Sequence, residues 1–69
     1  MEIDVKGLRR AMAAKNYSVV SLAGAAGIST TALNGWLNHG RNIRMDTLGK
    51  LAKALEVDIY DIAKEDEQP

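Results

Sequence analysis

SVVSLAGAAGISTTALNGWL, residues 18–37, carries small and apolar residues at a spacing that packs two short helices together at a steep angle. Ala23 is small where the second helix must cross closely, and Gly27 can supply the positive φ that a tight turn between the helices needs. Ser29 follows as the N-cap of the second helix, because its hydroxyl can accept a hydrogen bond from a free backbone N–H group. The stretch therefore predicts a helix-turn-helix.

The inner side of these two helices is apolar. Trp36 falls on that side together with Leu33 and Leu37, so we expect it to pack in the core, which has no Phe to fill it. A role as an aromatic contact in an interface is the alternative for Trp36. The inward set is Leu22, Ala26, Ile28, Leu33 and Trp36.

Similar signals along the rest of the chain predict five short helices. The first spans residues 4–15, the second follows a cap at Ser18 and ends near 26, and the third follows Ser29 and ends near 38. The fourth covers the apolar stripe of residues 45–55, and Asp58 with Asp61 resembles a capping box for a fifth at 59–63. No segment alternates with a period of two, so we expect an all-α fold, a compact bundle of five helices.

Length and composition bound the class of protein. With 69 residues, the chain is expected to form a single domain over residues 1–64, followed by a disordered acidic tail at 65–69. The absence of cysteine removes disulfides and thiolate metal sites and favours a reducing compartment, so we expect a cytoplasmic location. The apolar runs are far shorter than the roughly 20 residues that cross a bilayer, so no membrane partner is expected.

The charges are unevenly distributed although the formal net charge is zero. Residues 5–45 contain six cations and no Asp or Glu, whereas residues 46–69 contain seven acids and three lysines. Halves of opposite sign favour a nucleic-acid partner on the basic side, and simple solvation of separate helices is the alternative. The six cations are Lys6, Arg9, Arg10, Lys15, Arg41 and Arg44.

Two segments at this separation resemble the Cro and phage repressor type of helix-turn-helix domain, and the resemblance covers residues 8–62. The residues that carry it are Leu22, Ala23, Gly27, Ile28, Ser29, Leu33, Trp36, the run Met45-Asp46-Thr47-Leu48, and residues 51–57. The resemblance implies a lambda-repressor-like fold in which the second and third helices form the DNA-binding motif.

The family resemblance also implies that the third helix enters the DNA major groove and touches base edges. Asn offers a paired donor and acceptor that matches adenine, and Thr offers a hydroxyl and a methyl group for thymine. Because none of the outward residues is Arg or Lys, we expect a preference for A·T-containing steps. The implied base-contacting residues are Ser29, Thr30, Thr31, Asn34, Gly35 and Asn38.

Phosphate contacts are expected around this helix. The start of the second helix offers free N–H groups and a partial positive charge to a phosphate, and the loop after the third helix is where the family grips the backbone. The expected phosphate-contacting residues are Ser18, Val19, Arg9, Arg10, Lys15, His39, Arg41, Asn42 and Arg44.

The chain departs from the family pattern at several positions. Val19 stands where many members have a phosphate-binding Gln. Met12 and Leu37 stand where many members pair an Arg with a Glu, and an apolar pair of similar volume there is often neutral or stabilising. Gly35 in mid-helix costs roughly 1 kcal/mol relative to Ala, either for close approach to DNA or as a merely tolerated residue.

Two functions fit this sequence. The first is a sequence-specific DNA-binding transcriptional regulator or repressor of phage or mobile-element origin. The second is a helix-turn-helix scaffold that binds a protein, as an antitoxin or anti-repressor does. No base stands near a candidate nucleophile and His39 is the only histidine, so we expect no enzymatic activity, metal, cofactor or small-molecule ligand.

Binding to two half-sites predicts a homodimer, at least on DNA. The candidate dimer contacts are apolar or aromatic residues of the fifth helix, which could equally serve to close the core. They are Ile59, Tyr60 and Ile62.

Overall fold

Capping side chains fix where the first three helices begin. The computed structural model describes residues 1–40 and 42–64. Asp4 precedes α1 (Val5–Ala14) and accepts a hydrogen bond from the N–H of Gly7. Ser18 precedes α2 (Val19–Ala26), and Ser29 precedes α3 (Thr30–His39). Ser18 and Ser29 cap their helices as the sequence predicts, whereas Asp4 and Lys15 are caps of α1 and not part of it, so α1 is one residue shorter at each end.

The last two helices also begin and end close to their predicted positions. Helix α4 (Met45–Leu55) ends at Glu56, which adopts a left-handed conformation with φ of 57°. Asp58 and Asp61 form the expected capping box around α5 (Ile59–Ile62). Helix α5 stops one residue before the predicted end, because Ala63 is extended.

A short antiparallel strand pair, which the sequence does not predict, is added to the expected helical bundle. Strand β1 (Glu2–Ile3) pairs with β2 (Ala63–Lys64), with Glu2 opposite Lys64 and Ile3 opposite Ala63. Each strand has two residues, too few to show an alternating pattern, and the pairing joins opposite ends of the chain. The fold remains mostly helical, with five helices.

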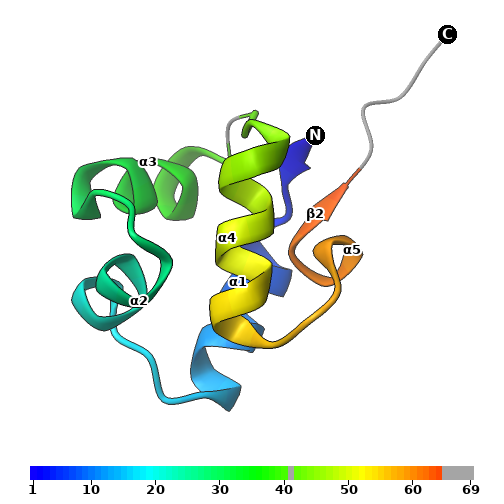
Figure 1. The fold of residues 1–69 in the computed structure, drawn as a ribbon. Coiled ribbons are helices and arrows are strands. Elements are labelled where there is room, and N and C mark those ends of the chain that lie inside the picture. Colours follow the sequence, from blue (N-terminus) through cyan, green and yellow to red (C-terminus); the bar gives the residue numbers. More distant parts are fainter. Residues whose placement is uncertain (41, 65–69) are drawn as a thin grey trace, which may run out of the picture.

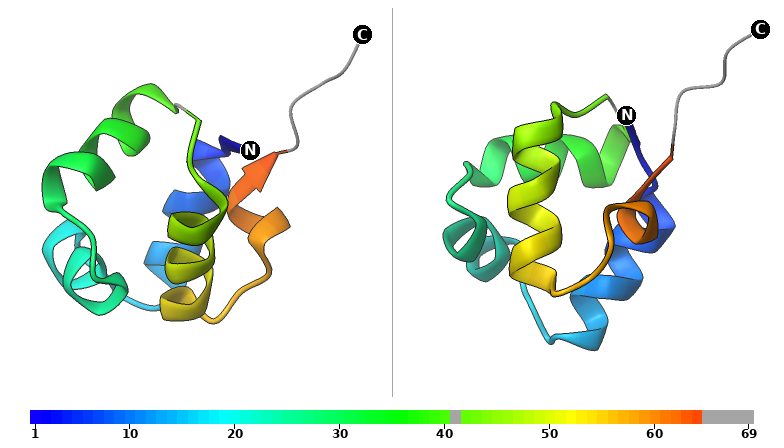
Figure 2. Two further views of the ribbon diagram at one scale, coloured as in Figure 1. Left: turned by 45° about the horizontal axis from the view of Figure 1, so that its top comes forward. Right: turned by 45° about the vertical axis from the view of Figure 1, so that its right-hand side comes forward.

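The helices surround one hydrophobic core. Helix α1 packs against α3 and α5, and α2 packs against α3 and α4, with α4 running through the middle of the view (Figure 1). The strand pair lies on the side of the bundle away from α2 in both further views (Figure 2). The largest fully buried side chains are Leu8, Leu22, Leu33, Leu48, Leu51, Leu55 and Ile62.

Two glycines are required by this arrangement. Gly27 ends α2 with φ of 71°, the left-handed conformation that the tight turn into α3 needs. A Cβ at Gly7 would collide with the backbone carbonyl oxygen of Asp61, so glycine allows the start of α1 to approach α5.

Trp36 is partly buried and packs against the core, as the sequence predicts. Among the described residues, no helix has the length and apolar character needed to cross a membrane.

Candidate nucleic-acid interface

Helix α3 separates apolar from polar residues by face. Leu33 and Leu37 are buried, whereas Asn34 and Asn38 are exposed on the outer surface. Ser29 already accepts a hydrogen bond from the N–H of Ala32 at 3.1 Å, so its oxygen serves first as a cap. Thr30 and Thr31 are exposed in the first turn, and Gly35 is half-buried. The residues expected to contact bases therefore lie on accessible parts of one helix and its cap.

The start of α2 presents backbone donors. The Ser18 hydroxyl accepts a hydrogen bond from the Ser21 N–H at 3.1 Å, and the Ser18 N–H donates to the Ser21 hydroxyl at 2.8 Å. The first N–H groups of a helix have no acceptor within that helix, and here they belong to Val19 and Val20. This terminus can offer those two N–H groups to a phosphate, while the Ser18 side chain is engaged with Ser21.

The segment after α3 is held by the first residues of the chain. Gly40 ends α3 with φ of 60°. Asn42 forms an isolated bridge with Glu2, and the N–H of Ile43 donates to the Met1 carbonyl oxygen at 2.9 Å. The residues of this segment are mostly polar, yet Ile43 is 5% exposed and anchors the segment in the core. The prediction for Arg41 lies outside the described residues.

We call residues 1–7, 42–43 and 61–64 the terminal junction, since they join both ends of the chain to the segment after α3. Besides the strand pair, the N–H of Asp4 donates to the Ile62 carbonyl oxygen at 2.9 Å. Ile3 lies at the centre of the terminal junction and is 2% exposed. Sequence reasoning missed Ile3 and Ile43, and the only signal for them was a single apolar residue within each polar segment.

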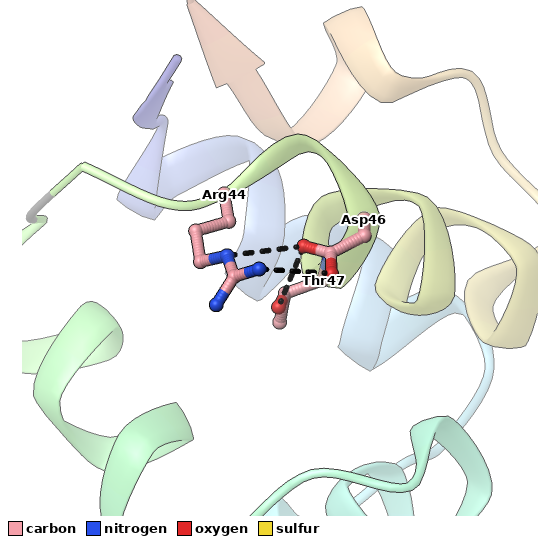
Figure 3. Close-up of polar contacts among 3 residues, drawn as sticks. All are labelled: Arg44, Asp46 and Thr47. Carbon is pink, nitrogen blue, oxygen red and sulfur yellow. Dashed lines mark hydrogen bonds and ion pairs between the residues drawn. The ribbon is translucent and has the colours of Figure 1, made fainter.

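Arg44 has an acidic neighbour at the start of α4. Its Nε lies 3.5 Å from Asp46 Oδ1, and its Nη2 donates to Asp46 Oδ2 at 3.5 Å (Figure 3). The Asp46 carboxylate also accepts a hydrogen bond from the Thr47 N–H at 2.8 Å. The Arg44 side chain is 85% exposed, so this ion pair is weak and a phosphate could replace it.

The cations of α1 differ in their surroundings. Arg9 Nη2 donates to the Leu37 carbonyl oxygen at 3.2 Å, in the last turn of α3. Arg10 is exposed. Lys15 forms an ion pair of 3.0 Å with Glu56, from the far end of α4. The fold thus places acids from the acidic half beside Lys15 and Arg44, and the separation of charges is less complete in space than along the sequence.

The apolar replacement of the family ion pair lies beside Arg9. Met12 and Leu37 are 8% and 6% exposed and line one open surface cavity of about 250 Å³. Arg9, Tyr17 and Val19 contribute to the same lining. At this place α1 and α3 are joined by apolar packing and by the hydrogen bond from Arg9 to a main-chain oxygen, so no charge has to be buried.

The candidate dimer residues of α5 divide into buried and accessible ones. Ile62 is fully buried, so its assignment as a dimer contact is wrong: it closes the core. Ile59 is partly buried against that core, and Tyr60 is 60% exposed.

Comparison with known families gives an assignment that agrees with this geometry. The profile of the Cro/C1-type HTH DNA-binding domain matches residues 7–66. The chain belongs to that family. The match covers α2 to α5 and α1 from Gly7 onward, including the α2–α3 motif and the segment that follows it. A comparison with curated protein sequences gave no match.

Solved structures of other proteins contain a segment or chain with the same fold. The restriction-modification controller protein C.AhdI from Aeromonas hydrophila aligns with a TM-score of 0.75 and 28% identity, over 83% of this chain and 86% of that one. A structure of native PhpD with cadmium (TM-score 0.80) and one of a hydroxyethylphosphonate dioxygenase variant (TM-score 0.82) are each 26% identical. Both alignments cover 99% of this chain but 15% of the longer one, so the likeness concerns one segment of those proteins.

Proposed function

We propose that this Cro/C1-type domain is a transcriptional regulator that binds double-stranded DNA sequence-specifically, with α3 in the major groove. The observation that carries the proposal is the division of α3, whose Leu33 and Leu37 hold one side in the core while Asn34 and Asn38 stand on the outside. An α-helix fits the major groove, and Asn can form two hydrogen bonds with adenine. The likeness to a controller protein supports a regulatory role.

In this proposal, phosphate contacts surround the recognition helix on both sides. The N–H groups at the start of α2 and the exposed cations Arg9, Arg10 and Arg44 supply positive charge, with His39 and Asn42 near the end of α3. Lys15 contributes when phosphate competes with Glu56 for its ammonium group. These contacts set affinity and register, whereas the short side chains of α3 select bases.

The experiment that tests the proposal is a titration of the chain against duplex DNA over a range of salt concentrations. If about four phosphates are neutralised by each subunit, log K falls with log salt at a slope near −3.6 per subunit. Fluorescence anisotropy with a duplex selected from a randomised pool measures this slope. A chain that binds no duplex at low salt, or binds one with no salt dependence, contradicts the proposal.

The same selection tests the proposed homodimer. Tyr60 is the accessible aromatic residue of α5, with Ile59 beside it, and we propose that the two contact a second copy on DNA. A dimer places its recognition helices one helical turn apart, about 10 base pairs, so the selected duplexes are expected to contain paired half-sites at that spacing. Selected sites with a single half-site contradict the dimer but leave DNA binding intact.

One observation favours the alternative of a protein-binding module. Helix α3 contains no Lys or Arg, so its outer surface could suit a protein as well as a groove. An antitoxin-like module predicts no steep salt dependence with DNA, and the titration therefore separates the two functions.

A further inference from the structure

Gly35 lies on the side of α3 that is opposite its two buried leucines. Side chains step by about 100° per residue around an α-helix, and Gly35 stands two positions from each of the buried residues Leu33 and Leu37. Those steps place it opposite the core, between the exposed residues Thr31 and Asn38 along the helix. The centre of the exposed face of α3 therefore has no side chain.

Among the residues that the structure describes, none requires glycine at position 35. Gly35 does not have the positive φ of Gly27 and Gly40. A Cβ at Gly35 would meet no heavy atom of the described residues within 4 Å, in contrast to Gly7, where it would meet the main chain of Asp61. Because glycine weakens a helix interior relative to alanine, Gly35 lowers the stability of α3 without relieving any internal clash.

The side chains around Gly35 are all short. Helix α3 contains no Arg, Lys, Gln or Glu, and its exposed polar residues are Thr, Asn and a terminal His. Hydrogen bonds to base edges form only within about 3 Å of the base atoms. A helix that reads bases with Asn34 and Asn38 must lie closer to the groove floor than one that reads them with longer side chains.

We propose that Gly35 is a positioning residue for base recognition: its missing side chain lets α3 lie deep enough in the major groove for Thr31, Asn34 and Asn38 to reach base edges. This inference rests on the proposed function and adds how its specificity is achieved. Side chains of increasing size at position 35 hold the helix away from the bases, while the phosphate contacts of the flanking segments can persist. Specific binding is thus lost before non-specific binding.

The test is a size series, Gly35→Ala and Gly35→Leu, with Gly24→Ala and Gly49→Ala as matched controls. A Cβ at Gly24 in α2 or at Gly49 in α4 likewise meets no described atom within 4 Å, and neither residue is a proposed DNA contact. All three alanine variants are expected to raise Tm by roughly 4–8 °C, through helix propensity alone. Thermal unfolding followed by circular dichroism measures this shift.

DNA binding then separates position 35 from its controls. With the duplex that the wild-type chain selects, Gly35→Leu is expected to weaken Kd by roughly 5- to 150-fold, the equivalent of one or more lost base contacts, and Gly35→Ala by less. With a random duplex, Kd is expected to stay within about twofold, since phosphates dominate non-specific binding. The controls are expected to retain the wild-type Kd for both duplexes.

Three results would overturn the inference. Wild-type Kd in Gly35→Leu would show that the helix does not need the space, and a lowered Tm in Gly35→Ala would show that glycine serves the fold. Equal weakening in the Gly24 and Gly49 variants would show a general effect of helix stiffening. In all three cases the wild-type chain still binds its selected duplex and the proposed function stands, whereas a wild-type chain that binds no duplex overturns both.

Discussion

The helix-turn-helix pair and the terminal junction are held together in different ways. The pair is one continuous stretch, in which Ser18, Gly27 and Ser29 set helix ends through contacts with residues at most four positions away. The terminal junction joins residues from the start, middle and end of the described chain through backbone pairing. Local chemistry thus shapes the helix that we propose to meet DNA, whereas distant segments position the loop beside it.

The difference matters for function because the junction supports a proposed phosphate contact. The Ile43 N–H is held by the Met1 carbonyl oxygen, and Asn42 is bridged to Glu2. Arg44 follows directly at the start of α4. Changes in the junction should therefore alter stability and loop position, whereas changes on the outer face of α3 should act chiefly on DNA binding and should not disturb tertiary contacts.

The largest expected change in the free energy of unfolding comes from Gly7→Ala, at the point in the terminal junction where α1 meets α5. The new Cβ would collide with the Asp61 carbonyl oxygen, so backbone must move, and we expect a loss of about 1–3 kcal/mol in the free energy of unfolding. Gly24→Ala is the matched control, since a Cβ there has open space and is expected to stabilise the protein by up to about 1 kcal/mol. Urea denaturation measures the free energy of unfolding of both variants. A loss of similar size in Gly24→Ala would contradict a close contact specific to Gly7.

The same contrast explains what the sequence could predict. Caps at Ser18, Ser29 and Asp58 were predicted correctly because a cap bonds to a backbone group within a few residues. Two-residue strands carry no readable period, and the Lys15–Glu56 pair joins segments whose approach only the tertiary fold determines. The outward positions of α3 were implied by the family resemblance, and the acidic neighbour of Arg44 stands only two residues along the chain, where the sequence itself shows it.

A smaller change in stability is expected from Ser29→Ala, which removes the N-cap of α3 in the helix-turn-helix pair. The Ala32 N–H loses its acceptor, so stability should fall by about 1 kcal/mol. Ser29→Asp keeps an acceptor but adds a negative charge next to the proposed DNA surface. We expect it to retain stability in thermal unfolding and to weaken duplex binding in anisotropy titrations. Wild-type stability in Ser29→Ala would show that the hydroxyl does not hold the start of α3.

The smallest effect on stability is expected from Asp46→Asn, where the loop held by the junction meets α4. The change removes the carboxylate that accompanies Arg44, leaving the guanidinium to contact phosphate, and we expect duplex affinity to rise by a few fold at low salt. Stability should fall by at most about 1 kcal/mol, since an acid near a helix N-terminus is mildly favourable.

Glu56→Gln removes the same charge beside Lys15, at the opposite end of α4, and separates two causes of such a gain. If release of Arg44 is responsible, Asp46→Asn has the larger effect on Kd in anisotropy titrations, because exposed charges act over about 8–10 Å at moderate salt. Equal gains in the two variants would show that Arg44 gains no more than Lys15, which Glu56→Gln releases as a second proposed phosphate contact. No gain in Asp46→Asn would contradict the proposed phosphate contact of Arg44, and the junction would then hold the loop for stability alone.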